Sequence, residues 1–144
     1  MNFVKATGNK LYYEGNLFEV KGVALMDDMT LWNKNAVVPL DDSIQERDYA
    51  FAALGEINTI RLAVKMDYFV DSEGAVRKSG FDFVDQQLAF AKKYGLKILL
   101  DMHVPNGGAV QDFAVTEDNK SFWENPEPQK RFTEGWEVVA RYYK

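Results

Sequence analysis

The segment INTIRLAV, residues 57–64, decides the fold class of this chain of 144 residues. Most of its residues are β-branched or apolar, which is the composition of a strand buried on both faces of a parallel sheet. Amphipathic segments that predict helices lie on either side of it, at residues 43–54 and 82–94. A buried strand between two such helices favours an α/β fold.

Both predicted helices carry signals for where they begin and end. Ser43 followed by Glu46 predicts a capping box at the start of the first helix, and Gly55 is expected in the left-handed conformation just past its end. Asp82 is expected to cap the second helix, and Gly95 to close it. Each helix is thus predicted to end immediately before the next strand begins.

The same alternation continues outward in both directions. Residues 11–26 predict a hairpin, turned at Glu14-Gly15-Asn16, that leads into a first buried strand at 21–26. Residues 96–104 predict a third strand, and residues 128–143 a third helix with apolar residues on one face. The order hairpin, β, α, β, α, β, α implies a parallel sheet with helical crossovers.

The length of the chain limits how much of a barrel it can form. A closed (β/α)₈ barrel needs about 250 residues, so 144 residues have room for three βα units. The predicted fold is therefore a partial (β/α)₈ TIM barrel, an amino-terminal hairpin plus three βα units, with residues 1–144 as one domain. Three parallel strands leave an edge without a partner strand. We therefore expect part of a larger protein, or a chain that completes itself by association.

Composition narrows the classes of partner and chemistry. Lys and Arg number 17 against 22 Asp and Glu, a net charge of −5, which argues against nucleic acid and anionic membrane as partners. The chain has no cysteine, which excludes disulfides, thiolate zinc sites and a cysteine nucleophile. Residues 1–5 open into polar sequence without the apolar core of a signal peptide, so either the protein stays inside the cell or a leader has been removed.

Three charged or titratable side chains fall on predicted strands. Strand alternation places Asp101 and His103 on one face of the third strand, and Arg61 lies within the central strand. Two interpretations of Arg61 are open, a structural ion pair with Asp101 or a role in a site. His103 is the only histidine, and a lone histidine is more often structural. Its place near the carboxyl end of a strand, where α/β active sites lie, favours a site.

Long loops follow each predicted strand, at residues 27–42, 65–80 and 105–127. Loops of this length are usually functional or disordered. Aromatic rings beside carboxylates and amides suit a sugar, although the same rings could serve only to fix the loops to the core. The candidate sugar contacts are Trp32, Tyr68, Asn106 and Trp123.

The sequence lacks the motifs of several other kinds of active or binding site. The sequence contains no phosphate-binding or dinucleotide-binding glycine pattern and no G-x-S-x-G nucleophile elbow. Asp101 and His103 share a strand face, but zinc normally needs three or four protein ligands, so this pair is a weak metal signal. We predict no cofactor and no metal.

Several segments together resemble the amino-terminal part of glycoside hydrolase family 5, the cellulase and mannanase family. Residues 17–23 (LFEVKGV) resemble its first hairpin and strand, and residues 54–62 (LGEINTIRL) resemble its second-strand signature, with one extra residue before the asparagine. Residues 95–103 (GLKILLDMH), with Pro105-Asn106-Gly107-Gly108, resemble its third strand and the loop that follows. The residues that resemble its third helix are Trp123, Phe132, Trp136, Ala140 and Tyr142.

The resemblance implies roles for two residues. Arg61 matches an arginine that keeps the nucleophilic carboxylate ionised, and His103 matches a histidine that contacts sugar hydroxyls. Ala24 stands where the family often has asparagine, which puts a supporting hydrogen bond in doubt. The family's acid/base and nucleophile glutamates follow later strands, so no catalytic residue is expected within residues 1–144.

The resemblance also implies an activity and partners. It implies retaining hydrolysis of β-1,4-type bonds in a polysaccharide or oligosaccharide, without a cofactor, and an extracellular location. Retaining hydrolysis needs two carboxyl groups about 5–5.5 Å apart, so the isolated chain is expected to be inactive. The alternatives are a non-catalytic sugar-binding module, or a barrel fragment that self-associates or pairs with the missing carboxyl-terminal part.

Overall fold

The computed structural model of the protein describes residues 2–27, 36, 43–105 and 122–144. Its elements follow the predicted order of a hairpin and then strands alternating with helices. The strands are β1 (Lys5–Thr7), β2 (Lys10–Tyr13), β3 (Asn16–Leu17), β4 (Gly22–Met26), β5 (Thr59–Lys65) and β6 (Lys97–Val104). The α-helices are α2 (Glu46–Leu54), α3 (Lys78–Lys93) and α4 (Pro126–Tyr143), and the 3₁₀ helices are η1 (Met66–Tyr68) and η2 (Phe122–Glu124).

Strands β4, β5 and β6 form one parallel sheet with β5 in the centre. The register places Arg61 of β5 beside Ala24 of β4 and Leu99 of β6. Every residue of β5 except Arg61 is buried, which confirms the prediction of a strand covered on both faces. The α/β fold with a parallel sheet and three helices is therefore confirmed.

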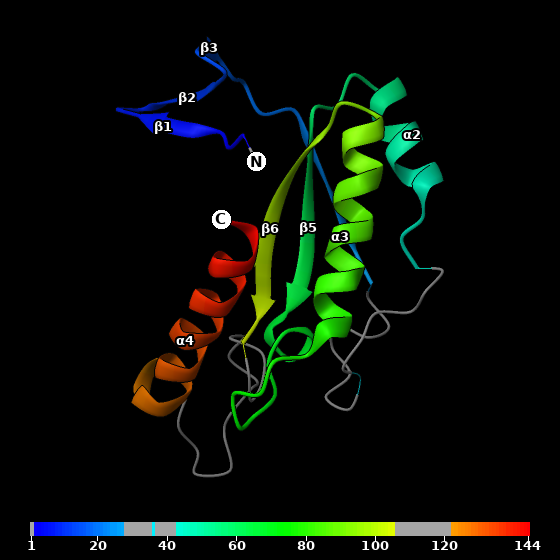
Figure 1. Ribbon diagram of the computed structural model, residues 1–144. Coiled ribbons are helices and arrows are strands. Elements are labelled where there is room, and N and C mark those ends of the chain that lie inside the picture. Colours follow the sequence, from blue (N-terminus) through cyan, green and yellow to red (C-terminus); the bar gives the residue numbers. More distant parts are fainter. Residues whose placement is uncertain (1, 28–35, 37–42, 106–121) are drawn as a thin grey trace.

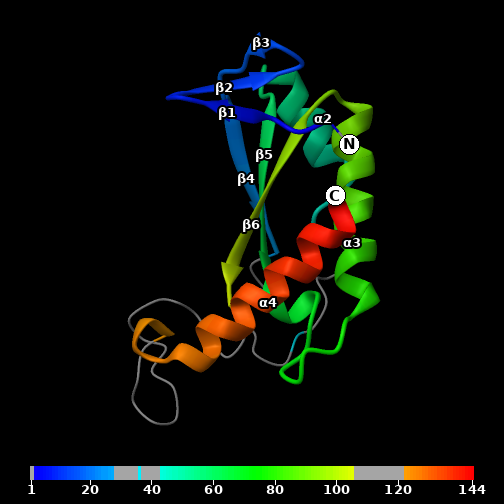
Figure 2. The same cartoon turned by 60° about the vertical axis from the view of Figure 1, so that its left-hand side comes forward.

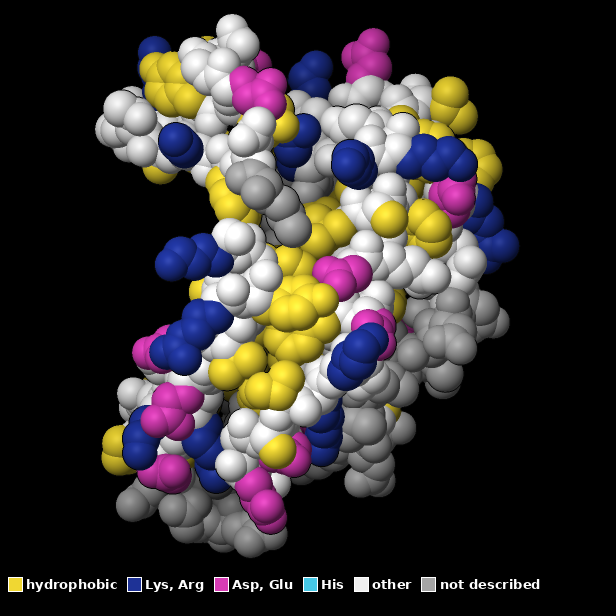
Figure 3. Space-filling model, in the orientation of Figure 1, with side chains coloured by type: hydrophobic (Ala, Val, Ile, Leu, Met, Phe, Trp, Pro, Cys, Tyr) yellow, Lys and Arg dark blue, Asp and Glu magenta, His cyan; other side chains and the backbone are white. Residues whose placement is uncertain are grey.

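Helices α3 and α4 lie on the same side of the sheet (Figures 1 and 2). Ile60, Leu62 and Val64 of β5 point into the core cluster with residues of these helices. Between α3 and α4 runs an open apolar groove of about 400 Å³, whose lining includes Ile98 and Leu100 of β6. Figure 3 shows hydrophobic side chains gathered in this hollow. Alternation along β6 turns Leu99, and with it Asp101 and His103, to the opposite face.

The amino-terminal strands form a separate antiparallel sheet in the order β1-β2-β3. It lies beyond the end of the main sheet at which β5 and β6 begin (Figure 1). The Lys97 ammonium at the start of β6 lies 4.0 Å from the centre of the Tyr13 ring, a cation–π contact between the two sheets. The hairpin therefore sits at the end opposite to the carboxyl ends of the strands.

The first strand was predicted as buried, and this prediction is wrong. β4 is mostly exposed, with Val23 and Met26 among the exposed large hydrophobic residues. Within the described residues no strand pairs with the outer edge of β4 or of β6. The predicted edge without a partner strand is thus present in the described part of the chain, and burial concentrates on the central strand.

The capping predictions for the first helix were also wrong. α2 begins at Glu46 with Gln45 as its N-cap, and the capping box joins Gln45 to Asp48, whose carboxylate accepts a 2.7 Å hydrogen bond from the Gln45 backbone N–H. Gly55 has φ −85°, and the left-handed residue is Glu56, with φ +57°. Several polar residues in a row can cap a helix, so the sequence alone did not choose among them.

The other two helices start earlier than predicted. α3 begins at Lys78, so Asp82 lies within its second turn and pairs with Lys78 instead of capping the helix. Gly95 follows the end of α3, where it was predicted to close the helix, and adopts the left-handed conformation with φ +70°. α4 begins at Pro126, capped by the Asn125 side chain, which accepts a hydrogen bond from the Glu127 backbone N–H.

Two glycines let the helices approach η1, the turn directly after β5. A Cβ atom on Gly80 of α3 would lie 2.1 Å from the backbone oxygen of Tyr68. A Cβ atom on Gly135 of α4 would lie 2.5 Å from the sulfur of Met66. These close contacts fix η1 at the carboxyl end of β5. Among the described residues, no helix is both long and apolar enough to cross a membrane.

Candidate functional site

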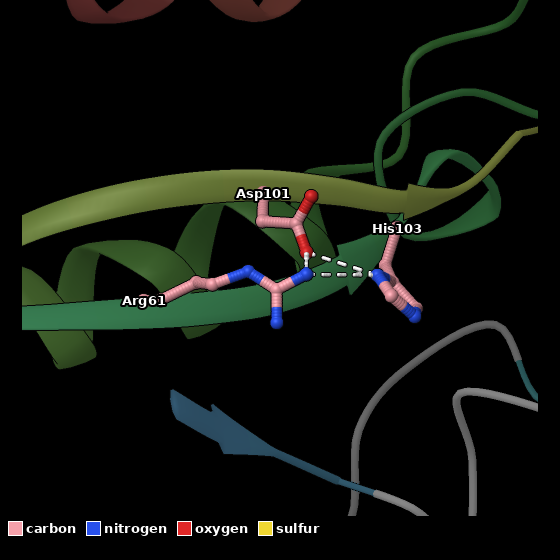
Figure 4. A network of polar contacts seen from close by, with 3 residues as sticks. All are labelled: Arg61, Asp101 and His103. Atoms are coloured by element: carbon pink, nitrogen blue, oxygen red, sulfur yellow. Dashed lines mark hydrogen bonds and ion pairs between the residues drawn. The ribbon is translucent and has the colours of Figure 1, made fainter. Parts of the chain in front are cut away.

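Three polar side chains lie together toward the carboxyl ends of β5 and β6. Arg61 comes from β5, and Asp101 and His103 come from β6. They lie on the face of the sheet opposite to α3 (Figure 4). The register of β5 and β6, regular as far as Val64 and Met102, brings Arg61 and Asp101 together on one face. It shifts directly after Val64, so His103 lies at an irregularity of β6.

One carboxylate oxygen joins the other two residues. Oδ2 of Asp101 lies 2.6 Å from the Arg61 guanidinium nitrogen and 3.0 Å from Nδ1 of His103. The same guanidinium nitrogen lies 3.2 Å from Nδ1 of His103, so the three groups form a triangle (Figure 4). The predicted ion pair between Arg61 and Asp101 is therefore present, and the predicted site residue His103 is part of it.

The cluster is partly open to solvent. The side chains of Arg61, Asp101 and His103 are 42%, 23% and 27% exposed. A guanidinium has five N–H groups, so Arg61 offers donors beyond the one used inside the cluster. Such an array can bind hydroxyl or carboxylate oxygens that approach from the open face.

Sequence reasoning missed a buried lysine at the same end of the sheet. Lys65 ends β5, is almost completely buried, and places its ammonium 5.4 Å from the centre of the Tyr68 ring. Burial lowers the pKa of Lys65, an effect that the nearby carboxylates of Asp67 and Asp27 oppose. Asp27, directly after β4, is buried as well. The signal was available, because strand alternation puts residue 65 on the same face as Arg61.

Two of the four residues predicted to contact sugar, Tyr68 and Trp123, lie in the described part of the chain. Tyr68 is buried in the core cluster, so it fixes the loop to the core and does not present its ring to solvent. Trp123 is 69% exposed and packs edge-on against Phe122, with ring centres 5.2 Å apart. Trp32 and Asn106 lie outside the described residues. For Trp123, Trp32 and Asn106 the role in binding sugar stays a prediction.

The described residues contain no group of three or more His, Cys, Asp or Glu side chains that could hold a metal ion. Asp101 and His103 do lie together, but the third member of their cluster is the cationic Arg61. A guanidinium has no acceptor and repels a metal cation. What the arrangement can do chemically is therefore hydrogen bonding and charge stabilisation.

Comparison with known protein families and curated proteins matches this chain to one family. The family model described as "Cellulase (glycosyl hydrolase family 5)" matches residues 6–144. Cellodextrinase A of Ruminococcus flavefaciens is 31% identical over 104 residues, which cover 72% of this chain and 30% of that protein. Endoglucanase C of Acetivibrio thermocellus is 33% identical over 107 residues, which cover 72% of this chain and 29% of that protein. The chain thus spans less than a third of the length of these curated relatives.

Solved structures show a similar fold. A crystal structure of a glycoside hydrolase aligns with a TM-score of 0.70 at 18% identity, over 88% of this chain and 38% of that one. The cellulose synthase subunit Z of Clostridioides difficile aligns with a TM-score of 0.58 at 20% identity, over 87% of this chain and 37% of that one. The arrangement of hairpin, sheet and helices is therefore one that larger proteins contain as a part.

Proposed function

The chain belongs to the cellulase family, glycosyl hydrolase family 5, and on this premise we propose that it forms one wall of the active site of a retaining β-glycosidase. The substrate class is a β-1,4-linked polysaccharide or oligosaccharide, in line with relatives named endoglucanase and cellodextrinase. Arg61 and His103 support the reaction from the carboxyl ends of β5 and β6. The mechanism uses no metal or cofactor.

The contact among Arg61, Asp101 and His103 carries this proposal. The Arg61 side chain is 42% exposed, and its guanidinium still has N–H groups to donate after it has paired with Asp101. In a complete site these donors stabilise a catalytic carboxylate in its ionised form. The imidazole of His103, next to them, contacts a hydroxyl group of the sugar. The exposed ring of Trp123 is proposed to stack on a sugar face. Trp32 and Asn106 lie outside the described residues, and we propose that Trp32 stacks on a sugar face and that Asn106 bonds sugar hydroxyls.

The chain by itself is proposed to have no turnover. Retaining hydrolysis needs one carboxyl group that protonates the leaving oxygen and a second, about 5–5.5 Å away, that attacks the anomeric carbon. In the cluster the one carboxyl group is that of Asp101, and its Oδ2 already bonds Arg61 and His103. On this proposal both reacting carboxyl groups come from other strands of a barrel.

A second candidate function is that of a non-catalytic or complementing barrel piece. The outer edges of β4 and β6, which pair with no strand of the described residues, favour it. Unpaired strand edges bind further strands readily. On this alternative the chain associates with a second chain that supplies the rest of the sheet, or binds sugar without cleaving it.

A chimera separates these functions. The chain replaces the matching stretch of endoglucanase C of Acetivibrio thermocellus, and hydrolysis of a soluble β-1,4-glucan is measured for the chimera and for the chain alone. Arg61→Ala and His103→Ala are each expected to lower kcat/KM of the chimera on the order of a hundredfold, the size of the loss when a charge-stabilising donor is removed. Arg141→Ala is the matched control, because Arg141 pairs with Glu137 on the exposed surface of α4.

The possible results of the chimera experiment distinguish the proposed function from its alternatives. An active chimera that loses activity in the Arg61 and His103 variants, but not in the Arg141 variant, supports the proposal. A folded, active chimera that tolerates both substitutions contradicts the roles given to Arg61 and His103. Turnover by the chain alone that survives both substitutions overturns the proposal, and binding of β-glucan by an inactive monomer favours the sugar-binding alternative.

A further inference from the structure

We propose that Gln129 is a positioning residue, which holds Trp123 so that its exposed ring is a preset platform for one sugar unit of a β-1,4-linked chain. The sugar-binding part of this inference rests on the function proposed above, whereas the fixation of the ring can be tested without any sugar. Gln129 is not among the residues assigned to that function, and two hydrogen bonds of its side chain give it a role.

The side chain of Gln129 reaches from the start of α4 back to η2. Its Nε2 atom donates to the backbone oxygen of Phe122 at 3.0 Å and to that of Trp123 at 2.9 Å. An amide nitrogen carries two hydrogens, so both bonds form at once, and the two carbonyl oxygens can only accept. The amide therefore has to turn its nitrogen toward η2. A carboxylate or an apolar side chain at position 129 cannot make these bonds.

The two bonds matter because η2 is a short element. It has three residues, and the backbone bond from the Asn125 N–H to the Phe122 oxygen is long, at 3.4 Å. The bonds from Gln129 are shorter and tie two consecutive residues of η2 to α4. The Phe122 ring adds a contact, since its centre lies 5.8 Å from that of the Phe132 ring on α4. The amide of Gln129 and the packing of Phe122 together fix η2 on the helix.

The ring of Trp123 is supported on one side and open on the other. It packs edge-on against the Phe122 ring, with the centres 5.2 Å apart, while 69% of Trp123 is exposed. A flat ring on a fixed backbone offers apolar area at little cost in conformational entropy when a ligand binds. The apolar face of a sugar ring is a ligand of matching shape. The bonds from Gln129 therefore serve to preset this surface.

Trp123 and the cluster of Arg61, Asp101 and His103 contact different units of a bound chain. The start of α4, directly after η2, lies beyond the carboxyl end of β6 (Figures 1 and 2). The cluster lies at the same end of the sheet, but on the face opposite to the helices (Figure 4). A ligand that uses both has to extend from one layer to the other. The occupant that fits is thus an oligosaccharide of several units and not a single sugar.

The indole N–H groups report on the ring directly. The chain is labelled with ¹⁵N-tryptophan, and the heteronuclear NOE of each indole nitrogen, which measures ps–ns motion, is recorded. The Trp123 signal is identified as the one missing in Trp123→Phe. Gln129→Leu removes both donors, so the NOE of Trp123 is expected to fall, while that of Trp136, which packs against the core from the same helix, stays unchanged. Lys130→Leu is the matched control, because Lys130 pairs with Glu134 on the exposed surface of α4.

A second variant and a sugar complete the test. Gln129→Glu can only accept at pH 7, so it is expected to lower the NOE of Trp123 as Gln129→Leu does. Cellohexaose is then titrated into the labelled chains and is expected to shift the wild-type Trp123 signal. Gln129→Leu should weaken this binding about threefold to tenfold, the range for the loss of one aromatic contact. Lys130→Leu should bind cellohexaose as the wild type does.

Each result supports or contradicts one part of the inference. A Trp123 NOE that keeps its wild-type value in both Gln129 variants overturns the positioning role. A Trp123 signal that cellohexaose does not shift, or equal affinity of wild type and Gln129→Leu, overturns the sugar platform. Failure of the proposed function is seen separately, in a chimera that tolerates the Arg61 and His103 substitutions. Gln129→Glu remains decisive if Gln129→Leu does not fold.

Discussion

Gly80→Ala should destabilise the protein through a clash with backbone, although alanine is the better helix former. The new Cβ atom would lie 2.1 Å from the carbonyl oxygen and 2.5 Å from the carbonyl carbon of Tyr68. Real Cβ contacts stay above 3.0 Å, so η1 or α3 must move by about 0.9 Å. Neither can give way easily, because Tyr68 is buried in the core and η1 continues directly from β5.

The magnitude follows from two opposing terms. Replacing glycine by alanine within a helix stabilises it by about 1 kcal/mol. Overpacking of a close contact costs about 1–3 kcal/mol, and more where backbone has to move. We therefore expect Gly80→Ala to lower the free energy of unfolding by about 2 kcal/mol. Gly135→Ala is the matched comparison, since its Cβ would meet the flexible end of Met66, and we expect a loss of less than about 1 kcal/mol there.

Urea unfolding followed by far-UV circular dichroism measures both effects as shifts of the transition midpoint at constant slope. The expected order of stability is wild type, then Gly135→Ala, then Gly80→Ala. Because η1 begins the loop after β5, the clash should also disturb the site end of the sheet, visible as a shift of the His103 ring signals. A Gly80→Ala variant as stable as the wild type, or more stable than Gly135→Ala, would refute this account of η1.

Two further predictions concern burial and charge. Leu62→Ala should lower the free energy of unfolding by about 3 kcal/mol, because Leu62 is fully buried. Leu99→Ala should lower it by less than about 1 kcal/mol, because Leu99 is 48% exposed on the open face. Equal losses in urea unfolding would contradict the assignment of the two faces. The Glu46 carboxylate accepts hydrogen bonds from Lys93 and Tyr94, which lower its pKa in the folded state. Its stabilising contribution is present above the unfolded pKa of about 4.3 and is lost as the pH falls through the lower folded pKa. Glu46→Gln should therefore unfold at lower urea than wild type at pH 7, with a gap that narrows below about pH 4; a gap that widens on acidification would count against the interaction.

Periodicity predicted the elements well because it reflects which faces are buried. The run around Arg61 is buried on both faces in the structure, as its composition indicated. The helix starts were less predictable, since α2 is capped by Gln45 and Asp48 where Ser43 and Glu46 were expected. Capping depends on local backbone angles, and several neighbouring polar side chains satisfy the same sequence pattern.

The candidate site was predicted in part. Strand alternation and the family resemblance pointed to Arg61 and His103, and the structure brings them within 3.2 Å of each other. Sequence reasoning took Tyr68 for a sugar contact, and the structure buries it instead. The local sequence around an aromatic residue in a loop is the same whether its ring faces solvent or the core, because its neighbours in space are distant in sequence.

The sequence by itself determined the alternation of strands and helices and the strand face on which each polar residue lies, because both follow from local periodicity. Only the tertiary structure decided that β5 is central, that β4 is an exposed edge, and that one oxygen of Asp101 lies between Arg61 and His103. These features depend on register between strands about 40 residues apart in the chain. Periodicity specifies which way a side chain points, and only the packing of the strands specifies what it meets there.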